Sequence, residues 1–105
     1  MNSHAHPFPE EDWPFDEPTN VVSITTSKVL EDGFPILLVT HDIDGGWQVL
    51  CGTTSHEADA RVECLGCLYA RDRTIGELAD LPPGWRAWRE SVVDPWQRQE
   101  TETEH

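Results

Sequence analysis

Two cysteines separated by two residues form the sharpest chemical motif of this chain. Cys64 and Cys67 stand in the sequence Cys-Leu-Gly-Cys. Thiolates at this spacing can share one zinc ion, and Cys51 with His41 or His56 would complete a tetrahedral set of nitrogen and sulfur ligands. Structural zinc sites usually combine two spaced pairs of ligands, and the middle of the chain holds no second Cys-x-x-Cys or His-x-His pair. We therefore expect no cofactor, with zinc as the alternative.

The same motif is also typical of redox-active proteins, in which an exposed pair begins a helix. Here Leu65 and Leu68 lie beside the cysteines, which favours burial of the thiols. A buried cysteine acts as a small hydrophobic residue. We therefore expect a protein that uses no cofactor. The alternative is a small zinc- or thiol-containing protein that uses Cys51, Cys64 and Cys67.

Four arginines carry most of the positive charge in the middle of the chain: Arg71, Arg73, Arg86 and Arg89. Guanidinium groups that converge can hold a carboxylate or phosphate by paired hydrogen bonds. Arg86 and Arg89 also lie among tryptophans, on which they can stack. We name Arg86, Trp88 and Arg89 as possible contacts for an anion or a partner. The alternative is that these arginines only neutralise nearby acidic residues.

No arrangement of residues predicts catalysis. His41 and Asp42, with Asp44 nearby, have the types of an acid–base pair, but a general base must also reach a substrate in a site that excludes water. A turn rich in Asp and Gly explains these residues equally well. The later acidic ligands of a calcium loop are missing, and no Gly-x-Ser-x-Gly nucleophile motif occurs. We expect a non-enzymatic protein with no catalytic residues.

Charge and composition divide the chain into three parts. Of its 105 residues, 20 are acidic and 7 are basic, for a net charge of −13. Residues 1–18 are acidic and proline-rich and residues 99–105 contain no apolar side chain, so we expect both to be disordered tails. Residues 19–98 remain as a single domain. The acidic balance argues against nucleic-acid binding. It is compatible with a basic protein partner, and the alternative is that the acidic residues only keep the protein soluble.

The sequence also indicates the cellular compartment of the protein. No apolar run approaches the ~18 residues that span a membrane. The N-terminus has no basic segment followed by an apolar one, as a secretory signal requires. Three cysteines, an odd number, favour a reducing compartment. We therefore expect a cytoplasmic protein without a membrane partner, whose oligomeric state the sequence leaves open.

Four stretches have the pattern of β-strands. Residues 21–25 alternate and are β-branched, residues 36–40 form a short apolar run, and residues 47–51 follow an Asp-Gly-Gly turn signal. The second and third of these predict a β-hairpin. A further strand is predicted at residues 85–89, after a Pro-Gly turn.

Two segments have helical signals. From Ala60 onward, apolar residues recur on one helical face: Val62, Leu65, Leu68 and Tyr69. The start of this segment also alternates as a strand would. Further on, Thr74 and Glu77 have the spacing of a capping box, which predicts a short helix beginning there.

These elements predict an α+β domain: a small antiparallel sheet of three to five strands with one or two helices packed on one face. Four tryptophans would supply much of its core: Trp47, Trp85, Trp88 and Trp96. The aromatic residues of the first tail are Phe8, Trp13 and Phe15. They either fold back onto the domain or remain in solvent, and their acidic surroundings favour solvent.

Several short motifs follow one another between residues 22 and 89. They are Val22-Ser-Ile-Thr-Thr, Lys28-Val-Leu-Glu-Asp-Gly, Pro35-Ile-Leu, Asp44-Gly-Gly-Trp-Gln-Val-Leu-Cys-Gly52, Leu78-Ala-Asp-Leu-Pro82 and Gly84-Trp-Arg-Ala-Trp-Arg89. In this order they resemble a family of small bacterial proteins of unknown function, the DUF2185 type, also described as Imm33-like immunity proteins. The resemblance implies a compact α+β domain without assigned catalytic residues, and a role in neutralising a toxin by covering it.

Overall fold

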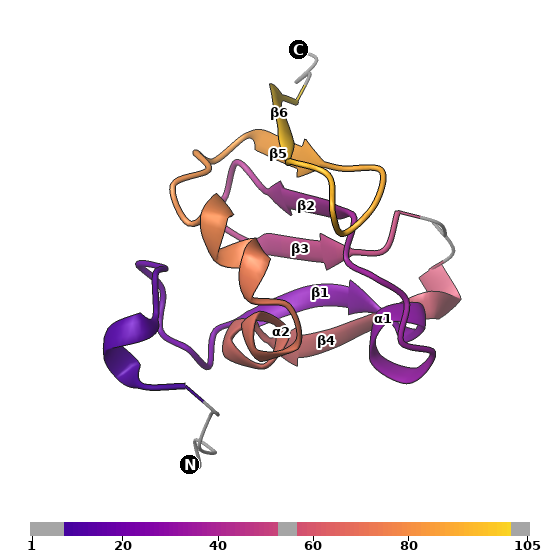
Figure 1. Cartoon of the computed structure of the whole chain (residues 1–105), viewed down its shortest axis with the longest axis horizontal. Coiled ribbons are helices and arrows are strands. Elements are labelled where there is room, and N and C mark those ends of the chain that lie inside the picture. Colours follow the sequence, from indigo (N-terminus) through magenta and orange to yellow (C-terminus); the bar gives the residue numbers. More distant parts are fainter. Residues whose placement is uncertain (1–7, 53–56, 102–105) are drawn as a thin grey trace.

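The computed structural model describes residues 8–52 and 57–101, which form an α+β domain (Figure 1). Within these residues, six strands form one sheet. The strands are β1 (Val22–Thr26), β2 (Leu38–His41), β3 (Trp47–Leu50), β4 (Ala60–Cys64), β5 (Trp85–Trp88) and β6 (Gln97–Glu100). The α-helices are α1 (Ser27–Glu31) and α2 (Leu65–Arg71), and the 3-10 segments are η1 (Glu10–Asp12), η2 (Glu57–Asp59) and η3 (Arg73–Leu78).

The sheet is larger than the sequence predicts, and it is mixed. Its strand order is β4-β1-β3-β2-β5-β6, in which β1 and β3 run parallel and the other neighbours are antiparallel. The expected sheet had three to five strands, all antiparallel. Two strands account for the larger number: β4 occupies the start of the segment with helical spacing, and β6 lies across the expected boundary between domain and C-terminal tail.

The hairpin of β2 and β3 confirms the prediction from the Asp-Gly-Gly signal. Val39 pairs with Val49 across the two strands. In the turn, the Asp42 N–H donates to the carbonyl oxygen of Gly46 over 2.7 Å. Gly45 has a φ of 98°, in the region that favours glycine. The predicted strand at residues 85–89 is also confirmed: β5 lies antiparallel to β2.

The segment after Ala60 is divided between strand and helix. Its alternating start forms β4, which pairs along its whole length with β1. The chain then turns at Cys64 and continues as α2, whose buried Leu65, Leu68 and Tyr69 are the residues that helical spacing places on one face. Both patterns in the sequence were therefore real, one after the other.

The capping-box prediction is wrong in its details. Residues 73–78 form the 3-10 segment η3, and its cap is Asp72, whose carboxylate accepts hydrogen bonds from the backbone N–H and the hydroxyl of Thr74. Gly76 lies against the ring of Tyr69, so that a Cβ there would come within 2.8 Å of it. Asp72, two residues before the predicted cap Thr74, caps this turn with its short side chain. The close approach of Gly76 to α2 requires glycine.

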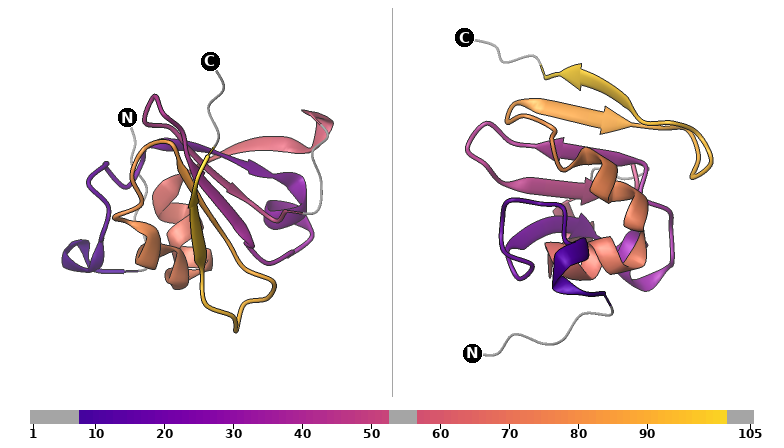
Figure 2. Two further views of the ribbon diagram at one scale, coloured as in Figure 1. Left: turned by 90° about the horizontal axis from the view of Figure 1, so that it is seen from above. Right: turned by 60° about the vertical axis from the view of Figure 1, so that its left-hand side comes forward.

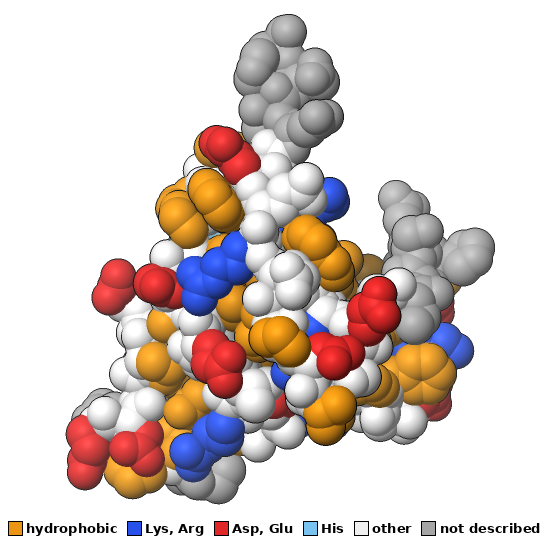
Figure 3. Space-filling model, turned by 45° about the horizontal axis from the view of Figure 1, so that its top comes forward, with side chains coloured by type: hydrophobic (Ala, Val, Ile, Leu, Met, Phe, Trp, Pro, Cys, Tyr) orange, Lys and Arg blue, Asp and Glu red, His pale blue; other side chains and the backbone are white. Residues whose placement is uncertain are grey.

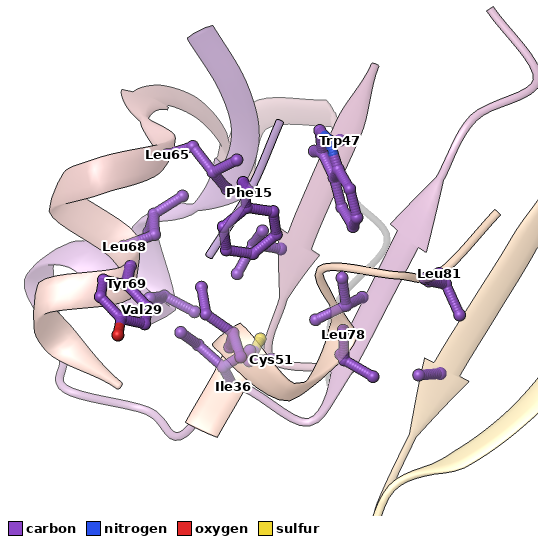
Figure 4. Close-up of a cluster of buried hydrophobic side chains, with 14 residues drawn as sticks. Phe15, Val29, Ile36, Trp47, Cys51, Leu65, Leu68, Tyr69, Leu78 and Leu81 are labelled. Carbon is purple, nitrogen blue, oxygen red and sulfur yellow. The ribbon is translucent and has the colours of Figure 1, made fainter. Parts of the chain in front are cut away.

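One face of the sheet is covered by α2 and η3, and the core lies between them (Figures 1, 2 and 4). Leu65, Leu68 and Leu78 pack from the helical side onto Val49 of the sheet, and all four are fully buried. Of the four tryptophans expected in the core, Trp47 is buried, whereas Trp85 and Trp96 pack on it only in part. Trp88 is exposed, because it alternates to the opposite face.

The N-terminal segment packs on the domain where the structure describes it. The ring of Phe15 is buried and lies 5.2 Å from Trp47 and 6.5 Å from Tyr69 (Figure 4). Trp13 stands edge-on to Tyr69 at 5.5 Å. The sequence favours a solvated tail over residues 1–18, but these rings bury enough apolar area to hold part of that segment against α2 and β3.

Candidate functional site

The two faces of the sheet differ in what covers them. Successive side chains of a strand point to opposite faces, so each strand contributes to both. One set faces the side covered by α2 and η3, and in β1, β2 and β3 its side chains are buried. The other set is exposed or half-buried, and we call it the open face. It consists of Val22, Ile24, Leu38, Thr40, Gln48, Leu50, Ala60, Val62, Arg86, Trp88, Gln97 and Gln99.

Apolar side chains gather at the β1–β4 end of the open face. Ile24 lies directly opposite Val62 in the antiparallel pair, and Val22 follows two residues away on β1. These three side chains are 41%, 64% and 66% exposed. Ile24 and Val62, with Ala60 and Arg61, line a shallow apolar depression. β-Branched residues this exposed on neighbouring strands form a patch rather than isolated surface residues.

An aromatic and a basic residue mark the other end of the open face. Arg86 and Trp88 both project from β5, and with Leu38 of β2 and Gln99 of β6 they line a second shallow depression. The Arg86 guanidinium donates to Gln99 Oε1 over 3.2 Å. Trp88 is 36% exposed. Two of the three predicted contact residues therefore lie side by side on one accessible surface.

The third predicted contact, Arg89, is elsewhere. It is buried, and its guanidinium donates to Asp72 Oδ2 over 2.6 Å and to the carbonyl oxygen of Ile36 over 2.9 Å. The guanidinium group of Arg89 also lies over the ring of Trp96, with 4.1 Å between the guanidinium carbon and the ring centroid. These bonds use the donors of Arg89 inside the protein, so it shares no surface with Arg86.

The remaining arginines do not converge on an anion site either. Arg71 donates to the carbonyl oxygens of Val29 and Leu30 and so ties α2 to α1. Arg73 lies over the ring of Tyr69, 5.1 Å from its centroid, and 4.0 Å from the carboxylate of Asp12. Each of these side chains has a local structural partner.

The three cysteines are separated into one pair and one distant residue. Cys64 and Cys67 are half-buried and their sulfurs lie 2.7 Å apart. Cys51 is fully buried, and its sulfur lies 3.5 Å from the hydroxyl of Thr26. Among the described residues, the group that could hold a metal is Glu63, Cys64 and Cys67, without Cys51. His56 lies outside the described residues.

His41 and Asp42 do not form an acid–base pair. His41 is buried, its Nδ1 lies 2.7 Å from the carbonyl oxygen of Leu81, and its ring stacks on Trp47 at 4.0 Å. Its Nε2 lies 3.8 Å from a carboxylate oxygen of Glu17, which accepts a hydrogen bond from Trp47. Asp42 instead accepts two hydrogen bonds from the Gln48 amide. Sequence spacing gave no signal for the contact with Glu17.

The side of the molecule in Figure 3 has a mixed surface, on which acidic, basic and apolar side chains alternate. The open face differs, because Arg86 is its single charged residue. Among the described residues there is no helix of the length and apolarity that a membrane span requires.

The chain was compared with protein-family models, with curated proteins and with solved structures, and it matches none of them.

Proposed function

We propose that this chain is a non-enzymatic, cytoplasmic protein-binding domain of the immunity type, which acts by covering a basic protein partner with its open face. The observation that carries the proposal is the exposure of Ile24, Val62 and Trp88 on one side of the sheet. A sheet with one face on a core commonly presents polar residues on the other. Apolar residues in that position favour a partner.

The energetics of association support this use of the face. Removing apolar surface from water contributes ~25 cal/mol per Å², and a stable interface buries ~800 Å² on each partner. Trp and Arg are the residues that most often dominate binding energy. Trp88 and Arg86 stand next to each other on β5, beside Leu38. They are therefore the expected centre of the contact.

Charge favours a basic partner. The chain carries a net charge of −13, whereas the open face itself holds no acidic residue. The net negative charge of the chain would attract a positively charged protein over a distance and raise its rate of association. The apolar centre would then hold the complex by excluding water. We expect salt to slow association more than it speeds dissociation.

The test compares two identical substitutions at exposed valines. Tagged full-length protein is used to capture partners from native cytosol, with Val62→Lys as the test variant and Val93→Lys as the control. Val93 is 86% exposed and lies outside the open face. We expect one stoichiometric basic protein with the wild type and the control. Its retention should fall roughly tenfold or more with Val62→Lys, because the variant buries an unpaired charge against a positive partner.

Trp88→Ala provides a second test that adds no charge, and it should also weaken capture. Equal recovery of the same protein by both lysine variants would contradict a role for the open face. Failure of the wild type to recover any stoichiometric partner would contradict the protein-binding function. A purified wild-type chain that forms a dimer broken by Val62→Lys would show that the face is occupied by a second copy instead.

A further inference from the structure

The junction of β4 and α2 places two sulfurs in contact. Cys64 ends β4 and caps α2, where its sulfur accepts a hydrogen bond from the backbone N–H of Cys67 over 3.2 Å. The two Sγ atoms lie 2.7 Å apart. We propose that Cys64 and Cys67 form a reversible dithiol–disulfide pair that exchanges with small-molecule disulfides. This inference does not depend on the proposed function.

The geometry requires little movement to form the bond. A disulfide has an S–S length of ~2.05 Å, so the sulfurs need to approach by less than about 1 Å. The backbone on the Cys64 side is held by the pairing of β4 with β1, in which Cys64 lies opposite Val22. Formation of the bond therefore joins two side chains that the fold already holds together, and it leaves the strand in place.

Accessibility distinguishes this pair from the third cysteine. Cys64 and Cys67 are half-buried, so that a small disulfide can reach the pair from solvent. Cys51 is 1% exposed and lies against Thr26 in the core. Exchange requires access of the attacking thiolate to a sulfur of the reagent. Cys51 is therefore expected to take no part.

The two thiols have different roles in the exchange. Burial raises the pKa of Cys67 to about 12, and its contact with Cys64 and the carboxylate of Glu63 adds to the effect. Cys67 thus stays protonated at neutral pH, whereas the sulfur of Cys64 is the one that accepts a backbone N–H. We assign the first attack to Cys64 and the second to Cys67.

The exchange is balanced as two successive substitutions. The Cys64 thiolate attacks one sulfur of a small disulfide R–S–S–R, forms Cys64–S–S–R and releases one R–S⁻. Cys67 then gives its proton to solvent or to the released thiolate, attacks Sγ of Cys64 and releases the second R–S⁻. The two protein thiols are oxidised by two electrons, and the small disulfide is reduced to two thiols.

A metal site at the same residues is the competing interpretation. Glu63, Cys64 and Cys67 offer three ligand atoms within 4.8 Å of one another. Two thiolates on one tetrahedral zinc, each at ~2.3 Å, would stand about 3.8 Å apart. The observed sulfur distance is more than 1 Å shorter than that. The sulfurs are therefore placed for a bond to each other, and zinc binding becomes an outcome of the test.

The experiment titrates the full-length folded protein with oxidised and reduced glutathione, traps thiols with N-ethylmaleimide and determines masses. We expect the wild type to lose two alkylatable thiols and two hydrogen masses, to link Cys64 to Cys67 in its peptide map, and to recover both thiols in dithiothreitol. Cys67→Ser should instead accumulate one glutathione on Cys64, because the second attack is lost. Cys64→Ser, which keeps a hydroxyl at the capping position, should accumulate severalfold less adduct.

Three results would overturn the proposal. The first is a wild type that keeps all its thiols, or only collects glutathione adducts, across the whole range of glutathione ratios. The second is a disulfide that includes Cys51. The third is one equivalent of zinc retained after dialysis of the reduced wild type against a zinc salt, lost in both serine variants and protecting the pair from oxidation.

Discussion

Arg89 donates a 2.6 Å hydrogen bond to Asp72 and so joins the end of β5 to the start of η3. The arginine side chain is almost fully buried, and the aspartate side chain is mostly buried. Asp72 also caps η3 through Thr74. This ion pair connects the sheet to the helical layer at a point where both charges have lost most of their water. The contribution of this ion pair to the stability of the fold is therefore best measured by removing one of the two side chains.

Asp72→Ala should lower the free energy of unfolding by about 3–5 kcal/mol, because it leaves the buried Arg89 charge without a carboxylate to pair with and removes the cap of η3. Urea unfolding followed by tryptophan fluorescence measures the change. The matched control is Asp80→Ala, which breaks the exposed pair of Asp80 with Arg98. That change should stay within about 1 kcal/mol. Equal losses in the two variants would contradict the role of the buried pair.

Two neighbouring threonines of β1 should respond in opposite directions to the same substitution. The hydroxyl of Thr25 is fully buried and has no hydrogen-bond partner among the described residues, so Thr25→Val should raise the free energy of unfolding by about 1 kcal/mol. The hydroxyl of Thr26 caps α1 by accepting from the Val29 N–H over 3.3 Å. Thr26→Val should therefore lower the free energy of unfolding by about 1 kcal/mol. Thermal unfolding of the two variants shows directly whether each is more or less stable than the wild type. A loss of stability in Thr25→Val would contradict the prediction that its buried hydroxyl is destabilising.

Phe15 should behave as a core residue although it lies in an acidic, proline-rich segment. Its ring packs on Trp47 and Tyr69. Phe15→Ala should destabilise the domain by about 3–5 kcal/mol through lost burial and the cavity left behind. Phe34→Ala is the control, because Phe34 is partly exposed and its loss should be less than about 1 kcal/mol. A difference of zero between the two would mean that the N-terminal segment does not contribute to the fold in solution.

The reactivity of Cys67 should depend on pH in a way that an unfolded chain does not show. Its pKa is raised from 9.0 to about 12, chiefly by burial, and iodoacetamide reacts with the thiolate. In reduced protein, the alkylation rate of Cys67 should rise about tenfold per pH unit through pH 10 without a plateau. In urea the same peptide should level off above pH 9. A plateau near 9 in the folded protein would contradict the raised pKa.

The same shift has a consequence for stability. A thiol whose pKa is higher in the folded state stays protonated there while the unfolded chain ionises. The stability that this provides is complete below about pH 9 and is lost as the pH rises from there toward 12. Cys67→Ser should be less sensitive to pH in this range than the wild type, as urea unfolding at pH 8 and pH 10 can show.

The elements that sequence patterns predicted well are those set by local contacts. The hairpin of β2 and β3 depends on a turn of a few residues and on alternation within each strand, and both can be read locally. The strand β4 was ambiguous, because its residues fit a strand and a helix equally until β1 is known to lie beside it. The strand β6 has no apolar residue, and only its pairing with β5 identifies it.

The candidate sites were likewise predictable where they depend on local sequence and hidden where they depend on distant contacts. The Cys64–Cys67 pair was evident from its spacing. Arg86 and Trp88 were named together as possible contacts, and they share a face because they stand two residues apart on one strand. The burial of Arg89 was not predictable, because its partner Asp72 is distant in sequence and nothing local links the two. The open face as a whole was also hidden. It depends on which strands are neighbours, and that information lies in the order of the sheet.

That order has a consequence for how the molecule assembles as it is synthesised. The two strands that flank β1 are β3 and β4, and both follow it in the sequence. β1 therefore leaves the ribosome without a ladder to join, and the local hairpin of β2 and β3 can close before it. Only when the chain has been made as far as Cys64 can the second ladder of β1, with β4, form. The Cys64–Cys67 pair is therefore placed only after β4 has joined β1, and the ladder between β2 and β5 closes later still.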